Sequence, residues 1–88
     1  METLTIRMKI TNDRSTFVTL SLEPWGEDYG MFPNNEFEII GEETDSTCYS
    51  HVCYFDTYIA VYAEGKANYY PRVYQNGELL DCGHNRQD

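Results

Sequence analysis

Acidic side chains dominate the middle of this 88-residue sequence. Between Arg14 and Lys66 lie fifty-one residues that contain ten Asp or Glu and no Lys or Arg. Such a distribution predicts a continuous negative field, which attracts a basic protein and can occupy a groove that otherwise binds phosphates. The densest acidic stretches predict a partner-binding surface made of Glu23, Glu27, Asp28, Tyr29, Glu42, Glu43 and Asp45.

The acidity has a second explanation, which the sequence leaves open. An acidic surface also confers solubility and discourages association through sheet edges. The eight tyrosines favour the binding interpretation, because tyrosine is enriched at the centres of protein interfaces, although it is also a good strand former. The single tryptophan, Trp25, lies between Pro24 and Gly26. We expect its ring to fold back over the core rather than to anchor a partner.

Cysteine and histidine offer a different kind of site. In an extended chain, residues two apart point to the same face, so His51 and Cys53 share one face, and Cys82 and His84 share another. On neighbouring strands these four would form a Cys₂His₂ zinc site, with Cys48 facing away. The spacing differs from the usual C-x₂-C knuckle, and small β domains readily bury cysteine. A zinc-stabilised structural or accessory domain is therefore the alternative, and no other cofactor is expected.

Catalysis is not expected from these residues. A cysteine nucleophile could use His51 or His84 as its base, but no flanking motif activates a thiolate. The adjacent carboxylates of Glu27 and Asp28 fall in a predicted loop, where solvent leaves such groups as ordinary acids. A chain this short also has little room for a pocket of ~300 Å³. We expect a non-enzymatic protein.

Length and composition restrict the class of protein further. A chain of 88 residues forms one domain, spanning residues 1–88. Its net charge of −9 argues against direct contact with nucleic acid or anionic lipid. No stretch approaches the ~18 apolar residues of a membrane span, and the N-terminus does not resemble a signal peptide. Three cysteines leave at least one unpaired, which fits a reducing compartment and predicts the cytoplasm.

Alternating apolar residues in the first half predict three strands. Leu4–Ile10 and Phe17–Leu22 are expected to pair as a hairpin around the polar residues between them. Pro24 should end that pairing, and the residues from Trp25 to Asn35 read as a long connection. A third strand is predicted at Phe37–Ile40.

The second half begins with a predicted polar loop at residues 41–47. Strands follow at Cys48–Phe55 and Thr57–Ala63, and a last hairpin, Tyr69–Gln75 with Glu78–Cys82, encloses Asn76-Gly77, the dipeptide typical of a type I′ turn. About seven short strands without helical periodicity predict an all-β fold, a small antiparallel β-sandwich or a partly open barrel. The exposed edges of such a sheet also leave a homodimer open.

One stretch resembles a known family. The run Leu22–Glu27, followed by Tyr29 and by a turn at Pro33, is similar to an LEPWGE-x-Y stretch in small uncharacterised bacterial proteins. Those proteins also carry a V-x-x-x-G hairpin in a late strand, here Val73 and Gly77. Asn34 stands where a glycine would be expected, and the likeness covers about half of the chain. The resemblance implies an Ig-like or cupredoxin-like β fold and assigns no catalytic residues.

Small size, acidity and the lack of a catalytic motif together predict a binding protein. The expected partner is a larger basic protein that handles nucleic acid, which this chain would block. Phage-encoded anti-defence inhibitors such as anti-CRISPRs, and immunity proteins that neutralise nuclease toxins, are classes with this combination of properties.

Overall fold

Alternating burial along the chain produces the strands. In Val18–Glu23, for example, every second side chain is buried, which gives the strand one inner and one outer face. The computed structural model describes residues 4–43, 49–64 and 70–87. The strands are β1 (Leu4–Thr11), β2 (Val18–Glu23), β3 (Glu27–Met31), β4 (Glu36–Glu43), β5 (Tyr49–Tyr54), β6 (Tyr58–Glu64), β7 (Arg72–Gln75) and β8 (Glu78–Leu79).

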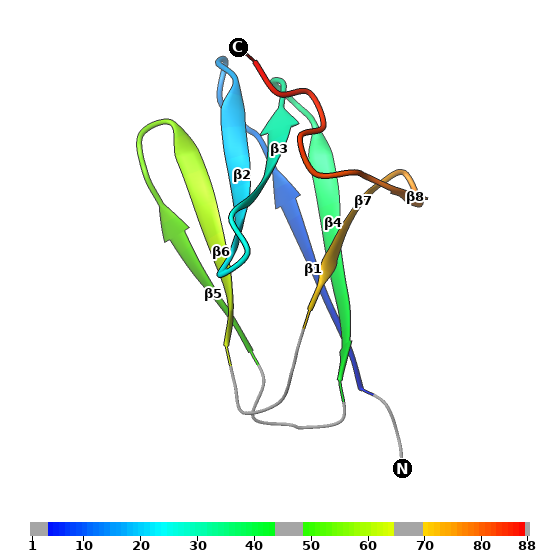
Figure 1. Cartoon of the computed structure of the whole chain (residues 1–88). Coiled ribbons are helices and arrows are strands. Elements are labelled where there is room, and N and C mark those ends of the chain that lie inside the picture. Colours follow the sequence, from blue (N-terminus) through cyan, green and yellow to red (C-terminus); the bar gives the residue numbers. More distant parts are fainter. Residues whose placement is uncertain (1–3, 44–48, 65–69, 88) are drawn as a thin grey trace.

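The strands form two four-stranded sheets that face each other (Figure 1). One has the order β1-β4-β7-β8 and the other the order β3-β2-β6-β5. Only the β2–β6 pair is parallel among the described strands. The predicted all-β, sandwich-like domain is therefore confirmed, and no described segment forms a helix that could cross a membrane. The core takes its largest buried side chains from both sheets: Leu20, Leu22, Met31, Phe37, Ile39, Val61 and Val73.

The predicted hairpin between the first two strands is wrong. β1 pairs with β4 in one sheet, whereas β2 pairs with β3 and β6 in the other. The chain crosses between the sheets at Asn12, a residue that is 2% exposed. The Asn12 amide donates hydrogen bonds to the carbonyl oxygens of Thr16 at 2.9 Å and Met31 at 3.0 Å. This buried amide satisfies the backbone of a crossing loop, so the polar residues predicted to close a hairpin instead join two layers.

The predicted long connection after Pro24 contains a strand. β2 and β3 form a hairpin in which Leu22 pairs with Glu27. Gly26, with φ of 68°, provides the left-handed position, and the Glu23 carboxylate accepts a hydrogen bond from the Gly26 amide at 2.9 Å. The stretch Leu22–Glu27 is therefore a tight turn that places its acidic residues at a sheet edge.

Other boundaries differ less from expectation. β4 extends to Glu43 and so includes residues predicted as loop. The Asn76-Gly77 turn is confirmed, since both residues have positive φ, 52° and 81°, between paired Gln75 and Glu78. Cys48 and Tyr69, at the predicted starts of two strands, lie outside the described residues.

The chain after β8 leaves its own sheet and runs along the edge of β3. The predicted strand to Cys82 therefore ends at Leu79. The Gly30 amide donates to the His84 carbonyl at 2.6 Å, and the Gly83 amide donates to the Asp28 carbonyl at 2.7 Å. This C-terminal segment, residues 80–87, bridges β3 and β8 on one side of the sandwich (Figure 1).

Substitution of Gly30 by alanine should destabilise the fold. A Cβ atom there would lie 2.5 Å from the Phe17 ring and 2.6 Å from the Asn85 carbonyl oxygen. We expect Gly30→Ala to lower the free energy of unfolding by ~2 kcal/mol, measured by urea denaturation, since overpacking forces neighbours apart. Gly77→Asn is the control, because Gly77 has open space around it and asparagine tolerates positive φ. Wild-type stability for Gly30→Ala would contradict the close approach of the C-terminal segment.

Candidate functional site

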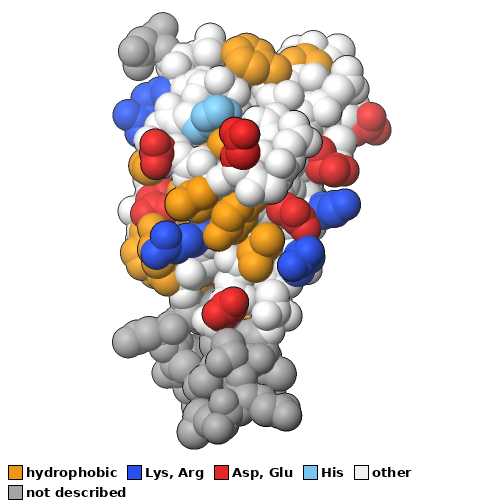
Figure 2. All heavy atoms as spheres, turned by 90° about the vertical axis from the view of Figure 1, so that its right-hand side faces the viewer, with side chains coloured by type: hydrophobic (Ala, Val, Ile, Leu, Met, Phe, Trp, Pro, Cys, Tyr) orange, Lys and Arg blue, Asp and Glu red, His pale blue; other side chains and the backbone are white. Residues whose placement is uncertain are grey.

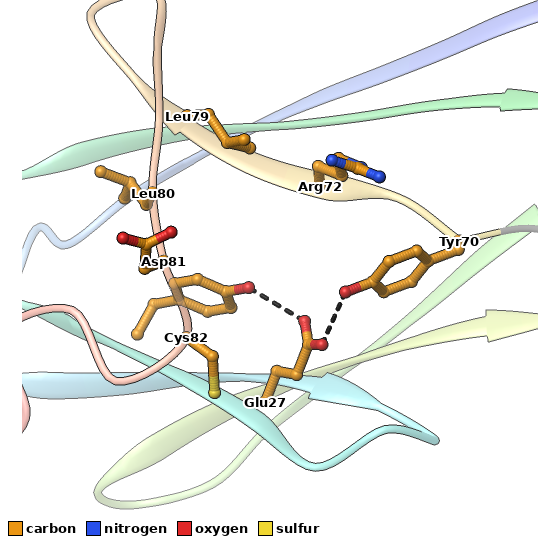
Figure 3. A pocket seen from close by; sticks show the side chains of 8 residues that line it. Glu27, Tyr70, Arg72, Leu79, Leu80, Asp81 and Cys82 are labelled. Atoms are coloured by element: carbon orange, nitrogen blue, oxygen red, sulfur yellow. Dashed lines mark hydrogen bonds between the residues drawn. The ribbon is translucent and has the colours of Figure 1, made fainter.

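A cavity of about 260 Å³ opens where the two sheets separate on the side of β3, β7 and β8 (Figure 3). One wall comes from β3 and the opposite wall from β7 and β8. The C-terminal segment provides the third wall. The lining residues are Glu27, Tyr29, Tyr70, Arg72, Leu79, Leu80, Asp81 and Cys82.

The Glu27 carboxylate lies between two tyrosine hydroxyls in the lining of this cavity. Its Oε1 accepts a hydrogen bond from the Tyr29 hydroxyl at 3.0 Å, and its Oε2 accepts one from the Tyr70 hydroxyl at 2.6 Å (Figure 3). Burial, and then the bond to Glu27, raise the pKa of Tyr29, while the bond to Glu27 is the main reason that the pKa of Tyr70 is raised. Both phenols therefore stay protonated and act as donors. They fix the carboxylate, and each of its oxygens keeps a lone pair for a further donor.

Asp28, the next residue, is bound by the C-terminal segment. Arg86 donates from Nε to Asp28 Oδ2 at 2.9 Å and from Nη2 to Oδ1, and the Cys82 thiol lies 3.8 Å from Oδ1. The Arg86 hydrogen bonds lower the pKa of Asp28, against the opposing effect of burial. Such a bidentate contact also fixes the orientation of the guanidinium. Asp28 therefore holds the wall of the cavity in place.

Aromatic side chains border the cavity on the solvent side. Trp25 and Tyr70 pack edge to face with ring centroids 4.7 Å apart, and they are 41% and 45% exposed. The expectation that Trp25 folds into the core is therefore wrong. Trp25 lies in the turn between β2 and β3, and its ring packs on Tyr70 instead. Figure 2, viewed from the β7 and β8 side, shows hydrophobic side chains gathered on this face with acidic and basic side chains around them.

The second acidic stretch reaches the same side of the molecule. Glu42 on β4 lines a hollow of about 220 Å³ together with Ile40, Gly41, Tyr70, Arg72 and Tyr74. Tyr70 and Arg72 also line the cavity that contains Glu27. The two acidic stretches, which are far apart in sequence, are thus connected through Tyr70, which precedes β7, and Arg72, the first residue of β7.

The predicted partner-binding residues do not all have the same role. Glu27 and Glu42 line hollows at the surface. Glu23 is used inside its own turn, where it accepts hydrogen bonds from Ser21 and Gly26. Tyr29 is buried and contributes its hydroxyl to Glu27. Asp45 and the side chain of Glu43 lie outside the described residues.

The continuous negative field predicted from sequence is wrong at this site. Arg72 and Arg86, which belong to the cation-containing end of the chain, lie against the acidic stretch 27–28. The Arg72 guanidinium carbon is 5.7 Å from the centre of the Tyr70 ring. The pairing of β7 with β4 and the return of the C-terminal segment to β3 bring these cations in, and neither event is visible as a local pattern.

The residues proposed for zinc are divided between two edges of one sheet. His51 and Cys53 lie on β5, with His51 Nε2 3.6 Å from Cys53 Sγ. Cys82 and His84 lie beside β3, where Cys82 contacts Asp28 and His84 packs against the ring of Phe37. β3 and β5 are the opposite edges of their sheet, so the structure does not bring the two pairs together. Among the described residues, no three His, Cys, Asp or Glu side chains are arranged to hold a metal ion.

Three further residues of the site were not identified from sequence. Tyr70, Arg72 and Asp81 line the cavity, yet no local pattern distinguishes them from other tyrosines and charged residues of the chain. Arg72 falls inside the predicted strand Tyr69–Gln75, which by itself does not indicate a site. These three residues reach the cavity only through the pairing of strands that are far apart in the sequence and through the path of the C-terminal segment.

No family model, no curated protein and no solved structure matches this chain. The resemblance of residues 22–29 to small bacterial proteins therefore stays a prediction.

The Asp28–Arg86 pair should make stability depend on pH. The pKa of Asp28 is below its ordinary value of 3.8 in the folded chain, so the ionised carboxylate contributes to the free energy of unfolding. That contribution is fully present above pH 3.8 and is lost as the pH falls through the lowered pKa. Arg86→Gln should therefore be less stable than wild type at neutral pH in urea denaturation. The difference should shrink as the pH falls below 3.8.

Arg7→Gln provides a matched control for that experiment. It removes an exposed pair with Glu38, whose nearest atoms are 3.4 Å apart, and exposed pairs contribute little to stability. A difference between wild type and Arg86→Gln that stays constant down to pH 2, or that is matched by Arg7→Gln, would contradict the assigned role of Asp28.

Proposed function

We propose that this chain is a non-enzymatic protein-binding module that recognises a basic segment of a larger partner. The main support for this function is the Glu27 carboxylate, which is held between the hydroxyls of Tyr29 and Tyr70 in an open cavity. A carboxylate whose position is already fixed loses little conformational freedom when it accepts a hydrogen bond from a lysine or arginine of a partner.

The surroundings of Glu27 favour a cationic side chain. The two adjoining hollows are lined by three carboxylates, of Glu27, Glu42 and Asp81, and by one guanidinium, of Arg72. The exposed rings of Trp25 and Tyr70 lie beside them, and aromatic faces attract Lys and Arg. An aromatic and acidic rim suits a basic segment better than an acidic one.

The dimensions of the site favour a protein over a small molecule. A cavity of about 260 Å³ is smaller than the ~300–1,000 Å³ of typical small-molecule pockets. Two of its lining residues, Tyr70 and Leu79, are themselves exposed, and Trp25, packed on Tyr70, extends the apolar area beyond the cavity. Exposed tryptophan and tyrosine next to a pocket are typical of the centre of a protein interface.

A nucleic-acid-handling protein is the partner class that we propose. Such proteins present lysines and arginines in grooves that bind phosphates, and an acidic module that occupies the groove blocks it. The chain would then act as an inhibitor, of the kind found among anti-defence proteins such as anti-CRISPRs or among immunity proteins, and would act in the cytoplasm. The net charge of −9 supports electrostatic attraction to such a partner.

Trp25 should report directly on binding, because it is the only tryptophan and borders the cavity. Titration with a short Lys- and Arg-rich peptide should change its fluorescence, and added salt should weaken the response, since the attraction is between charges. Glu27→Gln should lower the affinity about 10-fold or more, because a hydrogen bond to a charged group contributes ~1.5–3 kcal/mol.

Glu36→Gln is the matched control, since it removes the same charge from an exposed position that lines neither hollow. It should bind the peptide as wild type does. An equal response to a neutral peptide, or equal losses in the two variants, would count against recognition of a basic segment at Glu27.

A further inference from the structure

Three of the four sheet edges are protected against pairing with another strand. β1 carries Arg7 and Lys9 as exposed side chains on one face, and charged residues on an edge discourage pairing. β8 is only two residues long and includes Glu78. The edge of β3 is occupied by backbone hydrogen bonds to the C-terminal segment. The remaining edge is that of β5.

The free backbone groups of β5 can be assigned from its hydrogen bonds. The Phe55 amide donates to the Tyr58 carbonyl at 2.9 Å, which makes these two residues a hydrogen-bonded pair. Because such pairs alternate along an antiparallel ladder, residues 51 and 53 also point their amides toward β6. Ser50, Val52 and Tyr54 therefore point their N–H and C=O groups away from the sheet. No strand of the described chain pairs with them.

β5 carries no permanently charged side chain along this edge, and its His51 Nδ1 lies 3.2 Å from the Glu64 carboxylate of β6. β5 contains no Asp, Glu, Lys or Arg, and it is rich in exposed aromatic surface, with Tyr54 72% and Tyr49 55% exposed. Val52 packs against the core from the inner face. The Ser50 hydroxyl is buried without a hydrogen-bond partner among the described residues, an unusual state for a buried polar group.

We propose that β5 pairs antiparallel with β5 of a second copy of this chain, with Val52 on the two-fold axis. Val52 would exchange hydrogen bonds with Val52 of the second copy, and Ser50 with Tyr54, so that each free group is satisfied. In this register the inner faces of the two β5 strands lie on the same side of the joined sheet, since residues 50, 52 and 54 share one face. The two β3-β2-β6-β5 sheets would become one continuous sheet.

A second copy fits this edge because the register about Val52 is self-complementary and brings no Asp, Glu, Lys or Arg of β5 against another. Two chains of net charge −9 repel each other, and contact through a strand that contains no Asp or Glu limits that repulsion. A basic partner would find no carboxylate on β5, whereas it finds three around the Glu27 and Glu42 hollows. The dimer is thus independent of the proposed recognition of a basic segment. It would place the two Glu27 cavities at opposite ends, because β3 is the other edge of the sheet.

Hydrogen exchange followed by NMR tests the pairing in the unaltered protein. The amides of Val52 and Tyr54 should become protected as the protein concentration rises from ~1 μM to ~1 mM, the range of modest affinities. The amides of His51 and Cys53 are internal controls, since they bond to β6 in either state. Sedimentation equilibrium over the same range should show a monomer–dimer transition. A monomer throughout, or a dimer without protection at residues 52 and 54, would overturn the proposal.

Tyr54→Pro separates backbone pairing from side-chain contact. Proline removes an N–H that points away from β6, so the β5–β6 ladder is kept while dimerisation is lost. Tyr54→Ala removes the ring but keeps the N–H, and it should still dimerise. Circular dichroism establishes that both variants are folded. Dimerisation of folded Tyr54→Pro, or equal weakening in both variants, would contradict pairing through the backbone.

Discussion

Attachment of the C-terminal segment to the edge of β3 is the constraint on which the site depends. Two backbone hydrogen bonds, at Asp28 and Gly30, and the Arg86 contact to Asp28 hold the segment there. The attachment closes a sheet edge that would otherwise be open, and it forms one wall of the Glu27 cavity. It also requires a glycine at position 30, since no side chain fits between the Phe17 ring and the segment. Fold and site therefore depend on the same few contacts.

The two sides of the sandwich differ in chemistry. The side of β3, β7 and β8 combines carboxylates, a fixed pair of tyrosine hydroxyls and exposed aromatic rings. The opposite edge, β5, contains no Asp, Glu, Lys or Arg, and no strand of the described residues pairs with its outer side. Charged and aromatic groups discriminate among partners by complementarity, whereas an uncharged strand favours pairing with another strand. One small domain thus has two surfaces suited to different contacts.

Local patterns predicted most of the strands and the Asn76-Gly77 turn, because alternation and turn preferences act over a few residues. Local patterns do not predict which strands pair when the partners are far apart in the sequence. β3 was missed because Gly30 and the polar residues at its start interrupt alternation, although the strand is held by β2 and by the C-terminal segment.

Sequence patterns identify the acidic residues of the candidate site but not the residues that surround them. Glu27, Asp28 and Glu42 were singled out by the lack of nearby cations in sequence. Arg72 and Arg86 reach them only because β7 joins β4 and the chain end returns to β3. The Glu27 cavity likewise depends on Tyr70, which lies forty-three residues further along the chain.

The most direct test of recognition at Glu27 is an NMR titration with a Lys- and Arg-rich peptide, mapping backbone amide shifts. We expect the largest changes at residues 25–29, 70–72 and 79–82, the segments that border the cavity. Changes concentrated on β1 or β5, with the cavity residues unaffected, would contradict the proposed recognition site.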